Sequence, residues 1–146
     1  MRLYVIRHAI AEDQAPTQDD SQRELTKDGR KKMKQVVKGL DALDTRFDRI
    51  VTSPWARAME TTELLCQSPR AELLAMIAEK NETTGVVGHE PWLGELVAWL
   101  AFGDTRHGEQ LMLKKGGVVI LEGSAVPGGM QVHAILPPSV VRAARP

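Results

Sequence analysis

The chain has 146 residues, of which 42% are hydrophobic and 26% charged, as in a water-soluble globular domain that can build its own core. Lys plus Arg and Asp plus Glu number 19 each, so no overall positive charge would draw the protein to nucleic acid or to an anionic membrane. Cys66 is the single cysteine, and the apolar runs are too short for a signal peptide or a membrane span. We therefore expect one cytoplasmic domain over residues 1–146.

The first predicted elements are a strand, a loop and a helix. Residues 2–7 predict a short buried strand, and the polar residues 12–24 predict a surface loop. A helix is expected to begin after Thr26 as its N-cap, with Asp28 in its first turn. Its apolar stripe would consist of Met33, Val36, Val37, Leu40 and Leu43.

Strands and helices then alternate. Residues 47–52 predict a second strand, followed by a helix with Ser53 as N-cap and Pro54 as its first residue. Ser68 and Pro69 repeat that start pattern and predict a third, short helix.

The second half begins with a predicted third strand at residues 83–88. A helix is expected to start at Glu90 and Pro91 and to end at Gly103. Residues 117–121 and 130–136 predict an antiparallel hairpin.

This order predicts an α/β fold. We expect a single-domain three-layer sandwich, with a mostly parallel central sheet, an antiparallel edge and helices on both faces. Ligands of such sheets bind beyond the carboxyl ends of the strands, so functional side chains should follow the strands directly.

Basic and imidazole side chains do follow three predicted strands. The first strand ends in Arg7 and His8, the second is followed one helical turn later by Arg57, and the third is followed by His89. One edge of the sheet would therefore present two guanidinium groups and two imidazoles. This arrangement predicts a site for an anionic group.

Four segments carry a resemblance to a known family. LYVIRHAIAE, LTKDGRKK, IVTSPWARAMET and VVGHEP resemble, in order and spacing, the histidine phosphatase superfamily, and most closely its SixA branch of phosphohistidine phosphatases. The resemblance runs from Leu3 to about Leu136. It implies that His8 is the catalytic nucleophile, that His89 is a second catalytic residue at the phosphoryl group, and that Arg7 and Arg57 bind that group. It also implies no metal or cofactor, and a phosphorylated histidine-containing protein as substrate and partner.

Elementary chemistry agrees with these roles. Phosphoryl transfer depends on positioning and on stabilising the charge of the phosphoryl oxygens, for which the planar fork of arginine is well suited. For His8 to attack phosphorus, one ring nitrogen must be unprotonated while a carbonyl or carboxylate holds the other as a donor. We expect Arg7 and Arg57 to lower the pKa of His8.

The sequence departs from the family pattern in two places. Ala9 follows His8 where the family's RHG motif has glycine, so the loop there must use ordinary backbone angles. The segment 62–88, which separates Thr61 from His89, is short; whether it is a true deletion stays open. In larger relatives this region carries a carboxylate general acid. Formal candidates for such an acid are Glu63, Glu72, Glu79 and Glu82, all of which are more typical of solvated helix faces.

The absence of an obvious acid bears on the substrate. A P–O bond to an alkoxide needs a proton donor, whereas imidazole leaves readily once it is protonated, so a phosphohistidine substrate is favoured. Two alternatives stay open: a phosphatase of a small metabolite or of phosphoserine and phosphothreonine proteins, and a non-catalytic phosphate-binding module. A mutase would need a more enclosing pocket than this short chain offers.

Several other residues are assigned no catalytic role. Trp55 is expected either at the rim of the site or in the core. Structural positions are expected for Trp92 and Trp99, and surface positions for His107, Lys114 and Lys115. His133 is expected to face solvent or to be a hydrogen-bonded strand residue, and Cys66 to be in the core or on the surface.

Overall fold

The computed structural model describes residues 1–66 and 83–144. The predicted third helix after Ser68, together with Glu72, Glu79 and Glu82, lies outside the described residues.

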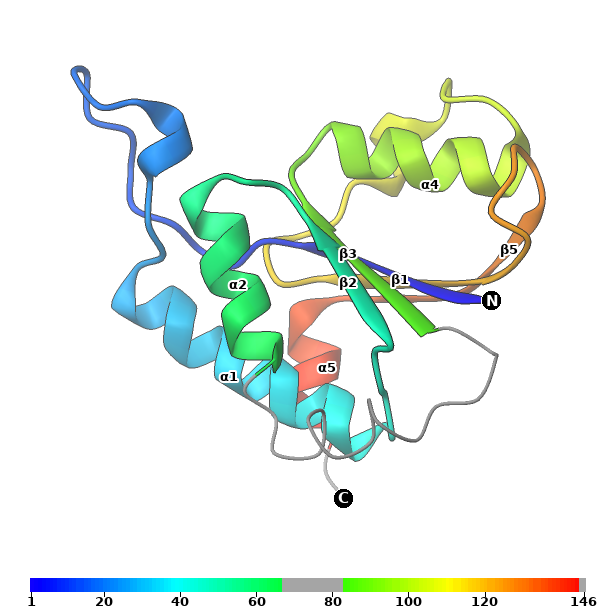
Figure 1. Ribbon diagram of the computed structural model, residues 1–146, viewed down its shortest axis with the longest axis horizontal. Helices are drawn as coiled ribbons and strands as arrows, with labels where there is room; N and C mark the ends of the chain where they lie inside the picture. Colours follow the sequence, from blue (N-terminus) through cyan, green and yellow to red (C-terminus); the bar gives the residue numbers. More distant parts are fainter. Residues whose placement is uncertain (67–82, 145–146) are drawn as a thin grey trace.

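A five-stranded sheet forms the middle layer (Figure 1). Its strands are β1 (Arg2–Arg7), β2 (Arg49–Thr52), β3 (Thr83–Gly88), β4 (Val118–Gly123) and β5 (Met130–Leu136), in the order β2-β3-β1-β4-β5. β2, β3 and β1 are parallel, while β4 pairs antiparallel with both β1 and β5. The predicted fold class is confirmed, although the antiparallel strand lies one place in from the edge.

Helices cover both faces of the sheet. They are α1 (Lys27–Ala42), α2 (Ala56–Cys66), α4 (Trp92–Phe102) and α5 (Pro138–Ala143), with short 3-10 helices η1 (Asp20–Gln22) and η2 (Gly108–Leu111). In Figure 1, α4 lies on one side of the sheet and α1, α2 and α5 lie on the other. This is the predicted three-layer arrangement.

Alternation along β1 builds two cores. Tyr4 and Ile6 belong to a cluster with residues of α1 and α2, whereas Leu3 and Val5 belong to a cluster with α4. Successive strand residues point to opposite faces, so a strand covered on both sides must be apolar throughout. β1 is therefore held rigidly between two layers, and its end is a firm support for the residues that follow.

The helix boundaries were predicted with different success. Thr26 caps α1 by accepting a hydrogen bond from the backbone N–H of Gly29 at 2.8 Å, as expected. Leu43 lies beyond the last turn and is 51% exposed, so its predicted place in the apolar stripe is wrong. α2 begins at Ala56, two residues later than predicted, and the carbonyl of Trp55 accepts hydrogen bonds from the N–H groups of Ala58 and Met59. α4 ends at Gly103, whose positive φ of 82° suits glycine.

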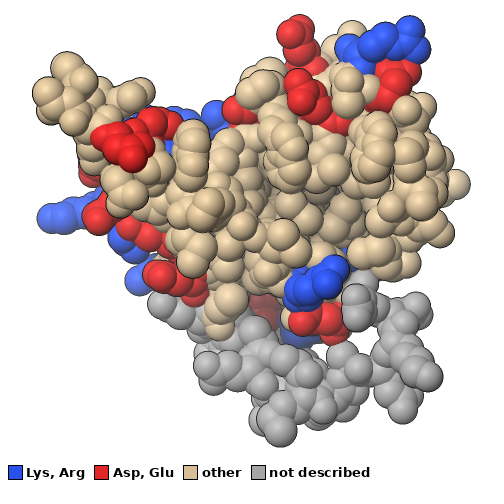
Figure 2. Space-filling model, turned by 45° about the horizontal axis from the view of Figure 1, so that its top comes forward, with Lys and Arg blue, Asp and Glu red and all other residues tan. Residues whose placement is uncertain are grey.

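Two features differ from the expectations. The six-residue helix α5 is too short to leave a periodic pattern in the sequence; it packs so closely on α1 that a Cβ on Gly39 would lie 1.7 Å from the carbonyl oxygen of Val141. Trp92 and Trp99 are 54% and 40% exposed rather than structural. Figure 2 looks obliquely onto the side that carries α4, and the middle of this face shows few charged side chains.

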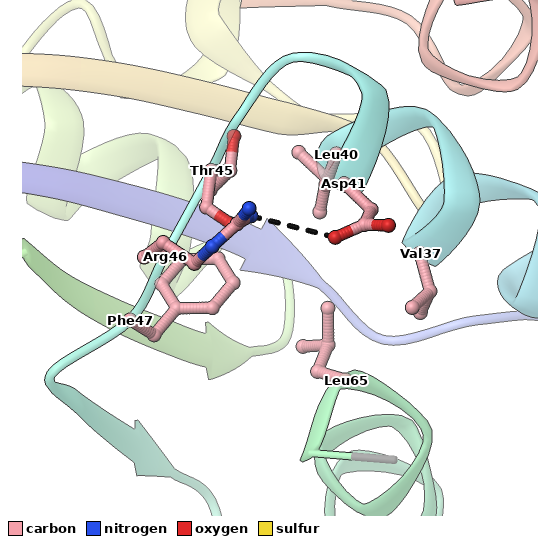
Figure 3. Close-up of a pocket in the computed structure, with 7 residues that line it drawn as sticks. All are labelled: Val37, Leu40, Asp41, Thr45, Arg46, Phe47 and Leu65. Atoms are coloured by element: carbon pink, nitrogen blue, oxygen red, sulfur yellow. Dashed lines mark hydrogen bonds and ion pairs between the residues drawn. The ribbon is translucent and has the colours of Figure 1, made fainter. Parts of the chain in front are cut away.

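A small cavity of about 20 Å³ lies between α1, α2 and residues 45–47 (Figure 3). Arg46 borders it and donates a hydrogen bond to Asp41 at 3.4 Å. Because residues 45–47 precede β2, this cavity lies at the amino-terminal edge of the parallel strands, away from the predicted site. No helix in the described ranges is long and apolar enough to cross a membrane.

Candidate active site

The predicted site residues meet at the carboxyl ends of β1, β2 and β3. Arg7 pairs with Gly88 across β1 and β3, and the backbone N–H of His8 donates to the carbonyl of Gly88 at 3.1 Å. The N–H of Ser53 likewise donates to the carbonyl of Val87 at 3.0 Å. Because three adjacent parallel strands end in register, the residues that follow them share one edge of the sheet, as predicted.

His8 is buried and oriented by its own loop. Its Nδ1 lies 2.6 Å from the carbonyl oxygen of Ala9, and a carbonyl only accepts, so Nδ1 carries the hydrogen and Nε2 carries the free electron pair. Burial lowers the pKa of His8 to about 3, and the charges of Arg57 and Arg7 contribute less. The expected direction is confirmed, but its main cause is burial rather than the arginines.

The loop after His8 is fixed to α2. The backbone N–H of Ala9 donates to Thr61 Oγ1 at 3.1 Å, and the Thr61 hydroxyl donates to the carbonyl of Arg57 at 2.7 Å. Ala9 is buried and has a negative φ, so alanine fits here without strain. One threonine therefore links the loop of the predicted nucleophile to the helix that carries Arg57.

Arg57 is buried in the first turn of α2. Its Cζ lies 4.4 Å from the centroid of the Trp55 ring, and its guanidinium donates to the carbonyl and to the carboxylate of Asp20 at 2.6 and 2.9 Å. Desolvation raises the pKa of Asp20, but the hydrogen bonds and charges of Arg57 and Arg23 outweigh this and lower it. The polar loop at residues 12–24 thus reaches the site through η1, which the sequence did not reveal.

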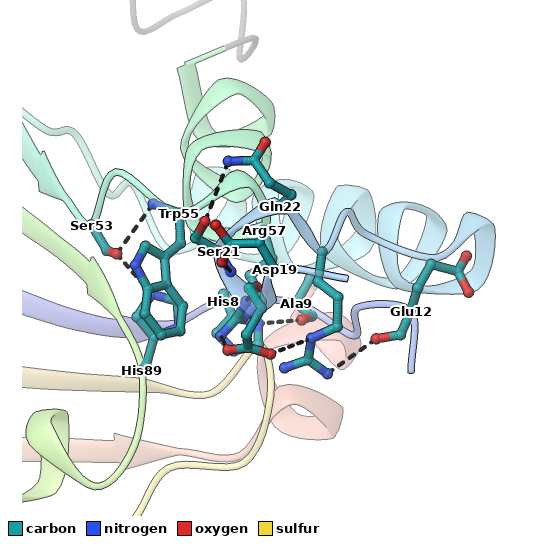
Figure 4. A network of polar contacts seen from close by, with 12 residues as sticks. His8, Ala9, Glu12, Asp19, Ser21, Gln22, Ser53, Trp55, Arg57 and His89 are labelled. Atoms are coloured by element: carbon teal, nitrogen blue, oxygen red, sulfur yellow. Dashed lines mark hydrogen bonds and ion pairs between the residues drawn. The ribbon is translucent and has the colours of Figure 1, made fainter. Parts of the chain in front are cut away.

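His89 lies between Ser53 and His8 (Figure 4). Its Nε2 is 2.8 Å from Ser53 Oγ, and its ring centroid is 4.9 Å from that of His8. The Trp55 ring lies 4.8 Å away on another side, which places Trp55 at the rim of the site. Burial, and secondarily the charge of Arg57, lower the pKa of His89 to about 4. Both imidazoles are therefore neutral near pH 7.

The side chain of Arg7 is held by a backbone carbonyl, and Glu90 in turn holds the segment that carries this carbonyl. Its Nη1 donates to the carbonyl of Leu113 at 2.9 Å. The carboxylate of Glu90 accepts hydrogen bonds from the N–H of Leu113 at 2.6 Å and from the N–H of Gly94 at 3.0 Å. Glu90 was assigned no role from the sequence, and its position directly after His89 is the only local sign of one.

Three of the predicted site residues keep buried polar atoms without a hydrogen-bond partner among the described residues. These atoms are Arg7 Nε, Arg57 Nε and His89 Nδ1. Buried polar groups are normally satisfied, so unpaired ones at one place require an explanation. The two guanidinium groups carry positive charge, and an oxyanion between them would fit this donor set.

The chain matches known proteins over most of its length. The sequence model of the family described as "Histidine phosphatase superfamily (branch 1)" matches residues 3–77. An uncharacterized protein from Picosynechococcus sp. is 37% identical over an alignment of 145 positions, gaps included, and the alignment covers 86% of this chain and 87% of that protein. The chain belongs to the histidine phosphatase superfamily, as the sequence motifs predicted.

Solved structures share the fold. The protein histidine phosphatase SixA, complexed with tungstate, has a TM-score of 0.75 at 24% identity, covering 95% of this chain and 98% of that one. The α-ribazole phosphatase from Shigella flexneri has a TM-score of 0.73 at 14% identity, covering 94% and 97%. At these identities the likeness shows the fold, and it includes phosphatases with different substrates.

Replacing Glu90 by alanine is expected to destabilise the protein by about 1.5–3 kcal/mol, the scale of hydrogen bonds to a charged group. The N–H groups of Leu113 and Gly94 would lose their acceptor, and the carbonyl that holds Arg7 would shift. Urea unfolding measures the first effect, and KM for p-nitrophenyl phosphate measures the second. The matched control is Glu95→Ala, at an exposed glutamate in the first turn of α4. Equal stability of the two variants would contradict the role of Glu90.

The two neutral imidazoles predict a pH dependence of stability. An unfolded histidine takes up a proton near pH 6.5, whereas folded His8 and His89 do so only at about pH 3 and 4. Between pH 6.5 and 4 the unfolded chain therefore binds more protons, so the free energy of unfolding should fall as the pH falls.

Urea unfolding at pH 7.0, 6.0 and 5.0 checks this expectation, because most carboxylates take up protons only at lower pH. A His8→Gln/His89→Gln variant should lose less stability over the same interval. NMR titration of the imidazole nitrogens should find His8 still neutral at pH 5, and a protonated His8 at that pH would refute the assignment.

Proposed function

We propose that the protein is a metal-independent phosphatase that works through a phosphohistidine intermediate on His8. The proposed substrate is phosphohistidine on a cytoplasmic phosphotransfer or signalling protein. The observation that carries the proposal is the state of His8: a buried, neutral imidazole, held at Nδ1, beside two arginines. This combination suits a nucleophile for an anionic phosphorus centre.

In the first step, Nε2 of His8 attacks phosphorus and forms a P–N bond. The substrate imidazole enters protonated on its other nitrogen, so the bond from phosphorus breaks with its electron pair staying on the leaving nitrogen, and the substrate leaves as a neutral imidazole. Arg7 and Arg57 neutralise the charge on the phosphoryl oxygens during the transfer. The carbonyl of Ala9 stabilises the charge that develops on the His8 ring through the Nδ1 hydrogen.

In the second step, water attacks the phosphorylated His8. The new P–O bond forms as the P–N bond to His8 breaks, which releases inorganic phosphate and restores the neutral imidazole. His89 lies beside the ring of His8 and is itself neutral, so it can donate a hydrogen bond to a phosphoryl oxygen without adding a charge.

The state of Asp20 favours a P–N substrate. Among the described residues, this is the carboxylate that contacts Arg57, and its pKa is lowered. An ionised carboxylate is a poor proton donor to an alkoxide, whereas an imidazole leaving group can be protonated before its bond breaks. Ester hydrolysis of a small metabolite or of a phosphoserine protein remains the alternative with the same nucleophile.

The experiment compares bond types in the presence of EDTA. We expect the purified protein to have kcat/KM for a phosphohistidine-bearing phosphotransfer domain at least about 100-fold above that for a phosphoserine peptide, since losing general acid catalysis costs about 10²–10⁴-fold. Spontaneous loss of phosphate is measured without enzyme. Substituted phenyl phosphates should react more slowly as the leaving phenol becomes more basic. A flat series together with faster ester cleavage would reject the phosphohistidine substrate.

A further inference from the structure

A basic pocket lies next to the candidate active site. Its volume is about 430 Å³, and it is lined by residues within 7–10, the first half of α1, residues 114–116 and both ends of α5. Its basic lining consists of Arg7, Lys32, Lys114, Lys115 and Arg142. Arg7, a predicted phosphoryl ligand, and Ala9, which follows His8, both line this pocket, so it borders the candidate active site.

The turn that carries the lysines is tied to the candidate nucleophile. The N–H of Gly116 lies 3.2 Å from the carbonyl oxygens of both Arg7 and His8 and donates to them. Gly116 has a φ of +78°, a conformation that favours glycine. Lys114 and Lys115 are exposed at a turn, as predicted, and these hydrogen bonds hold that turn beside the end of β1.

The basic groups of this pocket are short of acidic partners. Lys32 pairs with Asp28, one turn earlier in α1, at 2.6 Å. Lys114, Lys115 and Arg142 form no ion pair with any described residue. By contrast, Arg46 and Arg106, elsewhere on the surface, each contact an aspartate. Unpaired positive charges gathered in a concavity attract anionic groups more strongly than the same charges spread over a convex surface.

We propose that this pocket binds acidic side chains that neighbour the phosphorylated histidine on the protein substrate. The proposal rests on the proposed function and adds a preference to it. Lys114 and Lys115 come from a turn, whereas Arg142 comes from α5, so the charges stand on separate elements around a space larger than one phosphate needs. This arrangement suits several carboxylates of one peptide segment better than a single small anion.

The test uses pairs of phosphohistidine peptides. One peptide has Asp and Glu beside the phosphorylated residue, and the other has Asn and Gln at the same positions. We expect the wild-type protein to have a kcat/KM at least about 10-fold higher for the acidic peptide, a ratio that corresponds to about 1.4 kcal/mol. The ratio should fall as NaCl is raised from 50 to 300 mM, because added salt screens exposed charges.

The decisive variant is Lys114→Gln/Lys115→Gln/Arg142→Gln. Its ratio of acidic to neutral peptide is expected to approach one. The matched control is Lys31→Gln/Lys34→Gln/Lys38→Gln, which removes the same charge from exposed positions along α1 that do not line the pocket. Thermal unfolding and turnover of p-nitrophenyl phosphate establish that both variants are folded and active.

Three results would overturn the proposal. They are a wild-type ratio near one, an unchanged ratio in the pocket variant, and an equal loss in the control variant. The proposal would also be rejected if the lysines of the pocket favoured a small bisphosphate but not the acidic peptide. That result would indicate a metabolite substrate. The same peptide pair made with phosphoserine separates the two proposals, because the ratio still tests the pocket if phosphohistidine is not cleaved.

Discussion

Replacing His8 by alanine should abolish turnover, with kcat lower by at least about 10⁴-fold, the scale seen when a covalent nucleophile is removed. The variant lacks the nitrogen that is proposed to attack phosphorus, while Arg7, Arg57 and His89 keep their positions. Affinity for inorganic phosphate should therefore stay within several-fold of the wild type. This combination distinguishes an enzyme from a binding module, which needs the arginines but has no use for the nucleophile.

Two measurements check this result. Acid-quenched reactions with a ³²P-labelled phosphotransfer domain should trap label on the wild-type protein but not on the His8→Ala variant. Equilibrium binding of phosphate, followed by calorimetry, should be retained in that variant. His107→Ala, at an exposed histidine outside the site, serves as the control and should behave as wild type. Undiminished turnover in His8→Ala would refute the nucleophile and with it the proposed mechanism.

Replacing Arg57 should have the second largest effect. Arg57→Ala is expected to lower kcat/KM by about 10³-fold or more, as for other arginines that stabilise phosphoryl transfer. Arg57→Lys should recover little of this loss, because an ammonium group cannot reproduce the planar fork of the guanidinium. The guanidinium is fixed between Trp55 and Asp20, so its direction as well as its charge is set by the fold.

The matched control for Arg57 is Arg23→Ala. Arg23 contacts the same carboxylate of Asp20, at 2.8 Å, but it has not been placed at the phosphoryl group. We expect a small change in kcat/KM for that variant, measured on both a phosphohistidine protein and p-nitrophenyl phosphate. Equal losses in the two variants would show that Arg57 acts by holding Asp20 rather than by contacting the phosphoryl group.

The elements of the fold could be predicted from short stretches of sequence. Residues 3–6 of β1 and both valines of β3 contribute to cores on the two faces of the sheet, and α1 begins after Thr26 because that side chain caps it. The edge strand β2 is half exposed and was predicted two residues too long. α5 was missed, since its stability comes from its contact with α1 rather than from a pattern of its own.

The sequence by itself determined which side chains would meet at the candidate site. Arg7 ends β1, His8 and His89 directly follow β1 and β3, and Arg57 lies about one helical turn after β2, so the topology alone brings them to one edge. Only the tertiary structure decided how they are held. Asp20 reaches Arg57 across 37 positions, Glu90 reaches Leu113 across 23, and Arg7 reaches the same Leu113 across 106. Such contacts leave no local pattern, because they form only when separate loops pack together. The low pKa of His8 and the basic pocket arise in the same way, from burial and from the convergence of distant elements.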